Sequence, residues 1–143
     1  MILENYLTEI QGIEMYHGSE IQNLKVLDPK KNISKHMRGT NKQWIYGASN
    51  KTVASAFTFQ WNDGMGIKFG GQDGVYTISI PKKHLHLIKN PCSIYEVDPS
   101  SFKKGGKMKD EYLSKEKVKI LNETKYKTAK ECMQKHDIKI KVI

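Results

Sequence analysis

Three consecutive residues able to take part in chemistry, His17, Gly18 and Ser19, follow a short run with the period of a β-strand. The alternation over residues 13–17 places the imidazole of His17 on the apolar side of that strand, towards the interior or a cleft. Gly18 and Ser19 then end the strand. The imidazole is either a hydrogen-bonded core group or a ligand-binding one, and the strand pattern alone leaves both open.

Two aromatic residues eleven positions apart form the second candidate site. Tyr46 ends a predicted strand over 44–47, and Phe57 lies in a predicted helix over 51–61. If the strand runs antiparallel to the start of the helix, both rings face one cleft and form a slot for a flat heterocycle. A cationic heterocycle would gain about 0.5–2 kcal/mol more from the ring faces. The alternative is that both rings simply fill the core.

The remaining histidines and the cysteines do not have the spacing of metal ligands. His84 and His86 stand two apart on a predicted strand, without an acidic or thiol partner at metal spacing. Cys92 and Cys132 are forty residues apart and form no C-x-x-C motif. We therefore expect no metal, two reduced and partly buried thiols, and solvated histidines, His136 included.

Length and charge limit the class of protein. The chain has 143 residues, which suits one domain over 1–143, and a net charge of +9. Only Arg38 among its 24 basic residues is an arginine, so the surface favours anionic partners without the bidentate groups that read bases. No apolar run approaches the roughly 18 residues of a membrane helix. The first ten residues do not have the pattern of a signal peptide, so we expect a cytoplasmic protein, away from membranes and monomeric.

The elements that must position these residues follow from periodicity and capping. Strands come first and last with short helices between, which is typical of the α+β class. The predicted elements are a helix over 1–10, a strand over 13–17, a helix over 20–26 capped by Ser19, a long loop over 30–43, a strand over 44–47, a helix over 51–61 capped by Asn50, a glycine-rich hairpin connection over 64–74, strands over 75–80, 93–98 and 111–121, a helix over 123–135 capped by Asn122, and a strand over 138–143.

Three of these segments together resemble the ADP-ribosyltransferase fold, in the branch of diphtheria toxin and poly(ADP-ribose) polymerase with its His, Tyr, Glu signature. The likeness runs in the same order from about residue 13 to 121. The matched motifs are H-G-[ST] at His17-Gly18-Ser19, a strand-end tyrosine with an aromatic residue at plus eleven at Tyr46 and Phe57, within I-Y-x-A-S, and a glutamate that opens a strand at Asp110-Glu111-Tyr112.

This resemblance implies a split β-sheet core with short helices around an NAD cleft, and a mono-ADP-ribosyltransferase that uses NAD as substrate and no metal. The implied catalytic residues are His17, Tyr46 and Glu111. The implied NAD contacts are His17 at the adenosine ribose, the backbone of Gly18 at the nicotinamide carboxamide, Ser19 and Ala48 in the same pocket, Tyr46 and Phe57 on the two faces of nicotinamide, and Glu111 at the ribose hydroxyl beside the breaking bond.

The chemistry of NAD is consistent with those roles. Loss of nicotinamide leaves an oxocarbenium-like ribose, which a carboxylate stabilises, and the same carboxylate can draw a proton from the attacking nucleophile. Gly18, without a Cβ, lets the backbone come close to a ligand. We therefore expect a ligand, rather than more protein, to occupy the space beyond His-Gly-Ser.

Departures from the family pattern leave alternatives. Phe57 lacks the tyrosine hydroxyl, and Lys109 stands where arginine-modifying members carry a second acid, so arginine is a disfavoured acceptor. Glu96 and Glu116 are fallback acids if Glu111 is not the catalytic one. The acceptor itself, whether protein, nucleic acid or small molecule, is not readable, nor is any role as a toxin.

Three rival functions share the fold. The rifamycin-inactivating type has a similar length and an I-Y-I-V-E-P strand that residues 94–99 resemble, but its D-D-P-N segment has no counterpart in this chain. The RNA 2′-phosphotransferase type needs several arginines to grip phosphate and is disfavoured. A catalytically degenerate module would bind NAD or nucleic acid, with the lysines of 30–42 and 103–109 forming a patch for an anionic polymer.

Overall fold

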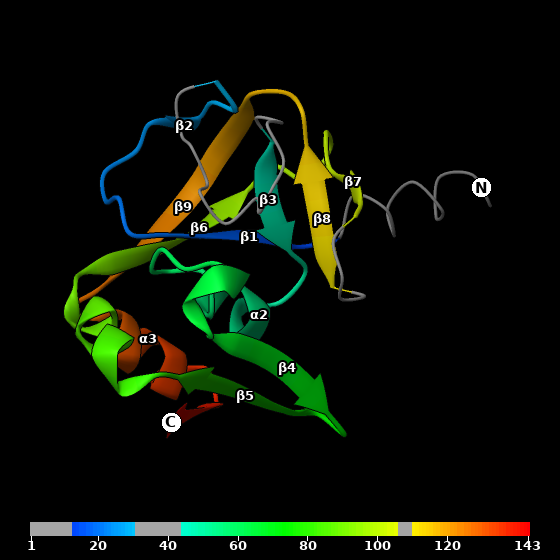
Figure 1. The fold of residues 1–143 in the computed structure, drawn as a ribbon. Helices are drawn as coiled ribbons and strands as arrows, with labels where there is room; N and C mark the ends of the chain where they lie inside the picture. Colours follow the sequence, from blue (N-terminus) through cyan, green and yellow to red (C-terminus); the bar gives the residue numbers. More distant parts are fainter. Residues whose placement is uncertain (1–12, 31–43, 106–109) are drawn as a thin grey trace.

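The computed structural model describes residues 13–30, 44–105 and 110–143 (Figure 1). The predicted helix over 1–10 and nearly all of the predicted loop over 30–43 lie outside the described residues. The described chain forms a sheet-rich α+β fold of two sheets with short helices between them. The α+β class expected from the sequence is therefore confirmed at this level.

The large sheet has seven strands in the order β2-β9-β6-β1-β3-β8-β7, and the small sheet has the order β10-β5-β4. The large-sheet strands are β1 (Met15–Ser19), β2 (Val26–Leu27), β3 (Ile45–Ala48), β6 (Cys92–Val97), β7 (Lys103–Lys104), β8 (Glu111–Ser114) and β9 (Val118–Tyr126). The small-sheet strands are β4 (Lys68–Gln72), β5 (Val75–Ile80) and β10 (Ile138–Val142). The helices are α2 (Lys51–Ser55), α3 (Ala129–Lys135) and the 3₁₀ turns η1 (Asp63–Met65) and η2 (Lys82–Lys89).

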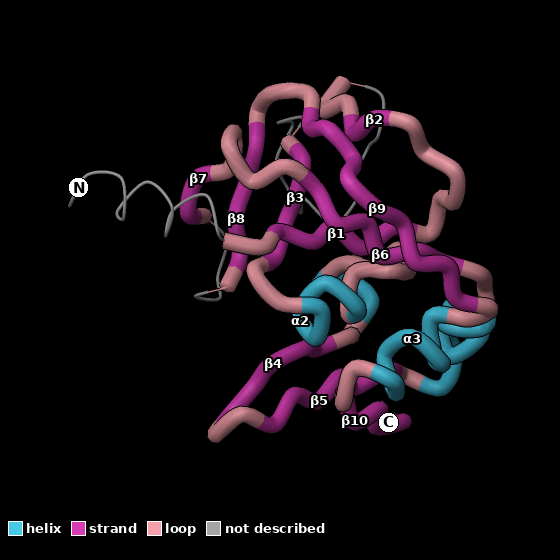
Figure 2. Tube along the Cα trace, turned by 180° about the vertical axis from the view of Figure 1, so that it is seen from behind, coloured by secondary structure: helices cyan, strands magenta, loops and turns pink. Residues whose placement is uncertain are grey.

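Helices α2 and α3 lie between the two sheets, as Figures 1 and 2 show from opposite sides. One core cluster fills this interlayer space and contains Tyr46, Ala48 and Phe57. A second cluster, with Met15 and Tyr95, covers the other face of the large sheet. Residues on β1 and β3 therefore face one core or the other according to the strand alternation.

The start of α2 was predicted correctly, and its end was not. Asn50 is the N-cap, and its side chain accepts a hydrogen bond from the Val53 amide at 2.8 Å. The helix ends at Ser55 instead of continuing to residue 61. The hydroxyls of Ser55 and Thr58 donate to carbonyls three residues earlier. Such local bonds, within an aromatic and β-branched run, favour a turn over further helix.

The predicted helix over 20–26 is wrong. Ser19 accepts from the Ile21 amide in a turn, and no helix follows. The Tyr95 hydroxyl donates to the Ile21 carbonyl at 2.6 Å and accepts from the Leu24 amide at 3.2 Å. These long-range bonds satisfy the backbone of the segment, so it needs no helical bonds.

The predicted strand over 111–121 is two strands, because the chain turns at residues 115–117 to give β8 and β9. The predicted helix over 123–135 is also wrong in its first half. Strand β9 pairs with β6 as far as Tyr126, and α3 begins only at Ala129 with Thr128 as its N-cap. Pairing with a central strand therefore overrides the cap signal of Asn122.

The histidine predictions also need correction. His84 and His86 lie in η2 rather than on a strand. His136 is half-buried, and its Nε2 lies 2.8 Å from the Tyr126 hydroxyl, so it is not a solvated surface group. Cys92 and Cys132 are both buried as free thiols.

Candidate functional site

The three strands that carry the His, Tyr and Glu motifs are neighbours in the large sheet. Tyr16 of β1 pairs with Ala48 of β3, and Ala48 pairs with Glu111 of β8. Directly opposite residues share one face of a sheet, so Tyr16, Ala48 and Glu111 form a row on the face towards α2. Strand β1 pairs with β3 at Tyr16 and Ala48, and with β6 along five residues, so β1 lies between β3 and β6 in one continuous sheet.

His17 follows Tyr16 in β1, and its side chain is buried. Its Nδ1 is 2.7 Å from the carbonyl oxygen of Tyr46. Because a carbonyl only accepts, Nδ1 carries the hydrogen, and burial lowers the pKa of the imidazole more than this bond raises it. The ring is thus neutral at pH 7, with Nε2 as an acceptor. By alternation the ring lies on the face of Tyr95, opposite to the side chains of Tyr46 and Glu111.

Tyr46 and Phe57 are in contact, with ring centroids 4.6 Å apart at an angle of 54°. Both are buried in the interlayer core, and Phe57 also stacks on Trp61 at 5.6 Å. A third ring between two others needs about 7 Å between their planes. In this arrangement the rings fill the core, and a nicotinamide between them requires that they separate.

On the side where a Cβ would project, Gly18 meets protein and not the open approach expected for a ligand. A Cβ built on Gly18 would lie 2.1 Å from the backbone carbonyl oxygen of Ala54 and 3.1 Å from Thr58. The space over this Cα therefore holds α2 and the turn after it, not a ligand. Glycine is needed there because a strand and a helix backbone come into contact.

Glu111 is 6 % exposed at the start of β8, opposite Ala48. Its neighbour Asp110 ties this strand end to two other elements. The Asp110 carboxylate accepts from the Ser49 hydroxyl at 3.1 Å and from the Tyr76 hydroxyl of β5 at 3.4 Å, and its carbonyl accepts from the Ser49 amide at 3.0 Å. These bonds tie the start of β8, in the large sheet, to the residue after β3 and to β5 of the small sheet. Ser49 belongs to the I-Y-x-A-S motif and Asp110 to the D-E-Y motif, but the hydrogen bonds between these two residues were not predicted.

Of the other predicted residues, Ser19 and Glu116 lie apart from the row of Tyr16, Ala48 and Glu111, and Glu96 extends it. Ser19 is half-buried at the end of β1, where its hydroxyl belongs to a local turn. Of the fallback acids, Glu96 pairs with Tyr16 and extends the row on its far side. Glu116 lies in the turn after β8. The structure therefore brings together Tyr46 with Phe57 and Ala48 with Glu111, and joins His17 to the backbone of Tyr46 alone.

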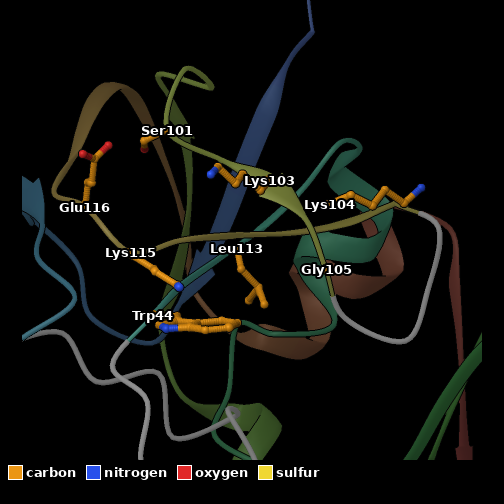
Figure 3. Close-up of a pocket in the computed structure, with 8 residues that line it drawn as sticks. All are labelled: Trp44, Ser101, Lys103, Lys104, Gly105, Leu113, Lys115 and Glu116. Atoms are coloured by element: carbon orange, nitrogen blue, oxygen red, sulfur yellow. The ribbon is translucent and has the colours of Figure 1, made fainter.

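A cavity of about 650 Å³ opens beside β7, β8 and the start of β3, at one edge of the large sheet (Figure 3). The lysines of 103–109 were predicted as part of a patch for an anionic polymer, but Trp44 and Lys115 were not predicted to join them. We call this cavity the β7–β8 cavity. Its lining residues are Trp44, Ser101, Lys103, Lys104, Gly105, Leu113, Lys115 and Glu116.

The described segments contain no cluster of three or more histidine, cysteine or acidic side chains that could hold a metal ion. Across the same segments, no helix has the length and apolar character needed to span a membrane.

The fold and site define a two-sheet α+β protein with an acidic side chain beside an aromatic pair. Comparison with protein-family models, curated proteins and solved structures finds no match. The function therefore has to be argued from this chain's own residues.

Proposed function

We propose that the protein is an NAD-dependent mono-ADP-ribosyltransferase with Glu111 as its catalytic carboxylate, within an ADP-ribosyltransferase-like fold. The observation that carries the proposal is the adjacency of β1, β3 and β8. Their motifs are up to 94 residues apart, yet Tyr16, Ala48 and Glu111 pair in one row. The resemblance requires that these three segments meet, and a chance likeness does not.

The chemistry needs few groups. The bond between ribose C1′ and the nicotinamide nitrogen breaks with its electron pair on nicotinamide, which leaves as a neutral molecule. The ribose carbon becomes oxocarbenium-like, and Glu111 stabilises that charge in a buried setting. The acceptor's nucleophilic atom bonds to C1′ and loses its proton to the carboxylate. Neutral His17, on the opposite face of the sheet, holds the backbone of Tyr46 in place through its Nδ1 hydrogen bond.

The aromatic pair supplies a second element of support. Tyr46 lies on the same face of β3 as Ala48, two residues away, and hence on the face of Glu111. If Phe57 moves away from Tyr46, the space opened is next to the carboxylate. Nicotinamide in NAD is flat and cationic, which suits the faces of two aromatic rings.

The test is nicotinamide release from NAD by the wild type and by Glu111→Gln, which keeps shape and removes charge. We expect release to fall by about 10²-fold or more, the effect of removing a well-placed electrostatic group. Glu96→Gln and Glu116→Gln are matched controls that should keep most of the rate. If the rate of nicotinamide release falls in one of these control variants instead, the catalytic acid is misassigned. If the wild type releases no nicotinamide above the buffer rate, the proposal fails.

One observation favours a second candidate, a non-catalytic NAD-binding module. Because Tyr46 contacts Phe57 directly, nicotinamide has no slot beside Glu111 in the described arrangement, and an NAD molecule held by its other groups would be bound but not cleaved. Calorimetric titration distinguishes the two, because a module would bind NAD with unchanged affinity after Glu111→Gln and without releasing nicotinamide.

A further inference from the structure

We propose that the β7–β8 cavity binds single-stranded nucleic acid, with a base on Trp44 and phosphates on Lys103 and Lys115, and that this strand is the acceptor. The acceptor role rests on the proposed function. The binding itself does not.

The dimensions and lining of the cavity suit one nucleotide. Its volume of about 650 Å³ lies within the range of small-ligand sites. Leu113 and Trp44 offer an apolar floor and a flat indole, and Ser101 supplies a hydroxyl. An aromatic face beside positive charge is the combination that single-stranded nucleic acid binders use.

The charges at the cavity have a clear sign. Lys103 and Lys115 enter it from β7 and from the turn after β8, and Glu116 is the one acid among its lining residues (Figure 3). Lys104 is not counted, because it pairs with Tyr112 on the opposite face of the sheet from Leu113, and its ammonium group lies 5.8 Å from that ring centre. Lysine ammonium groups bind phosphate as point charges. We therefore expect binding with little preference for sequence.

Trp44 already attracts a cation. The Lys115 ammonium group lies 5.2 Å from its ring centre. A base stacking on the indole would displace this group, which can then pair with the phosphate of the same nucleotide. Stacking of a base on an aromatic ring is generally stronger than an exposed cation–π contact, so the exchange favours the ligand.

The cavity also lies along the strand that leads to Glu111. One face of β8 and of the residue after it carries every second side chain, namely Glu111, Leu113 and Lys115. The same face of the neighbouring β3 segment carries Trp44 and Tyr46. Leu113 is about 7 Å along the strand from Glu111. A nucleotide held in the cavity therefore leaves its neighbour in the chain near the carboxylate. A strand bound there presents base nitrogens and sugar hydroxyls to the ribose carbon.

Binding is measured by fluorescence anisotropy of a labelled ten-nucleotide DNA, with the Glu111→Gln protein and no NAD. The double variant Lys103→Gln with Lys115→Gln should weaken binding about tenfold at low salt. It should also lower the salt slope by about 1.4, from two lost phosphate contacts. The control pair, Lys139→Gln with Lys141→Gln, removes equal charge from exposed positions on β10. Equal weakening by the two pairs would overturn the proposal.

Stacking is tested by Trp44→Leu, which should weaken binding about tenfold, whereas Trp44→Tyr should retain most of it. Bound DNA should quench tryptophan fluorescence in the wild type and not in Trp44→Tyr. Thermal melting of each variant shows whether it is folded. If Trp44→Leu is folded and binds like the wild type, no base stacks there.

Two competitors separate the sources of phosphate. Inorganic polyphosphate carries charge without bases and should compete weakly. If it binds as tightly as DNA, the site is a general anion patch. If NAD displaces the DNA by simple competition, the cavity holds NAD, and the acceptor assignment is wrong.

The outcome is separable from that of the proposed function. Nicotinamide release without DNA binding leaves the enzyme and removes this acceptor. DNA binding without nicotinamide release leaves a binding protein and removes the enzyme. Both together predict transfer of radiolabel from NAD to DNA, lost in the Lys103 and Lys115 double variant.

Discussion

Trp44 directly precedes β3 and Tyr46 lies within it, so the two side chains, two residues apart, point to the same face of the large sheet. Their surroundings differ completely. Tyr46 is 7 % exposed and packs on Phe57 beneath α2. Trp44 is half-buried at a cavity and has a lysine ammonium group over its ring. The same kind of side chain, on the same face, is a core residue in one place and a cavity wall in the other.

Whether an aromatic residue on this face is buried in the core or lines a cavity therefore depends on which elements pack over it, and not on the strand pattern. Helix α2 and the turn after it cover β3 where Ala48 pairs with Tyr16, and bring Phe57 onto Tyr46. At the other end of β3, Trp44 lines a cavity together with lysines of β7, and the Lys115 ammonium group lies over its ring. The predicted slot relied on Tyr46, whereas the aromatic residue that lines the cavity is Trp44.

The largest effect should come from truncating the two rings. Tyr46→Ala should lower the free energy of unfolding by about 3–5 kcal/mol, because a buried aromatic ring is lost. Trp44→Ala should cost about 1 kcal/mol, since a half-exposed ring loses less. Urea denaturation measures both. Equal costs would remove the contrast between core and cavity. Tyr46→Phe, which keeps the plane, should be mild for stability and for NAD affinity alike.

The close approach of α2 to β1 is tested by Gly18→Ala. The new Cβ would meet the carbonyl of Ala54 at 2.1 Å, so the helix must shift, at a cost of about 3 kcal/mol. Gly70→Ala is the matched control, because nothing lies within 4 Å of a Cβ built there. Thermal melting compares the two. If Gly18→Ala melts like Gly70→Ala, the space over Gly18 is open and the ligand interpretation returns.

Helix α2, which packs over Tyr46, can be destabilised at its N-cap, Asn50. Asn50→Ala removes the bond to the Val53 amide and should cost about 1 kcal/mol of stability. Since α2 carries the cover over Tyr46, protease cleavage within residues 51–61 should rise. Thr128→Ala removes the equivalent cap of α3 and is the control. It should cost a similar amount and leave cleavage at 51–61 unchanged.

The smallest effect concerns pH. Burial lowers the pKa of His17 from its ordinary 6.5 in the folded protein. Below pH 6.5 the unfolded chain therefore binds a proton that the folded protein does not, so stability is lost as pH falls and is present above 6.5. Burial lowers the pKa of His136 in the same direction. His17→Gln should reduce the loss of stability between pH 7 and 5, and His86→Gln, exposed on η2, should not. An unchanged pH profile after His17→Gln would show that this imidazole is accessible to solvent.

Much of the local structure was predictable because local chemistry determines it. The alternation around His17, the cap at Asn50 and the strand over 75–80 each depend on neighbouring residues alone. The errors fall where distant partners decide. Tyr95 holds the segment after Ser19 out of a helix, and pairing with β6 extends β9 past Asn122.

For the candidate site the division is similar. The candidate residues could be named from the chain alone: a histidine at a strand end, aromatic residues at a fixed spacing and an acid at the start of a late strand. Their surroundings could not: that β1, β3 and β8 are neighbours, that α2 fills the space over Gly18, and that Trp44 rather than Tyr46 borders a cavity all depend on the packing of distant segments. The physical reason is that periodicity states which face a side chain takes, whereas the element packed on that face comes from far along the chain.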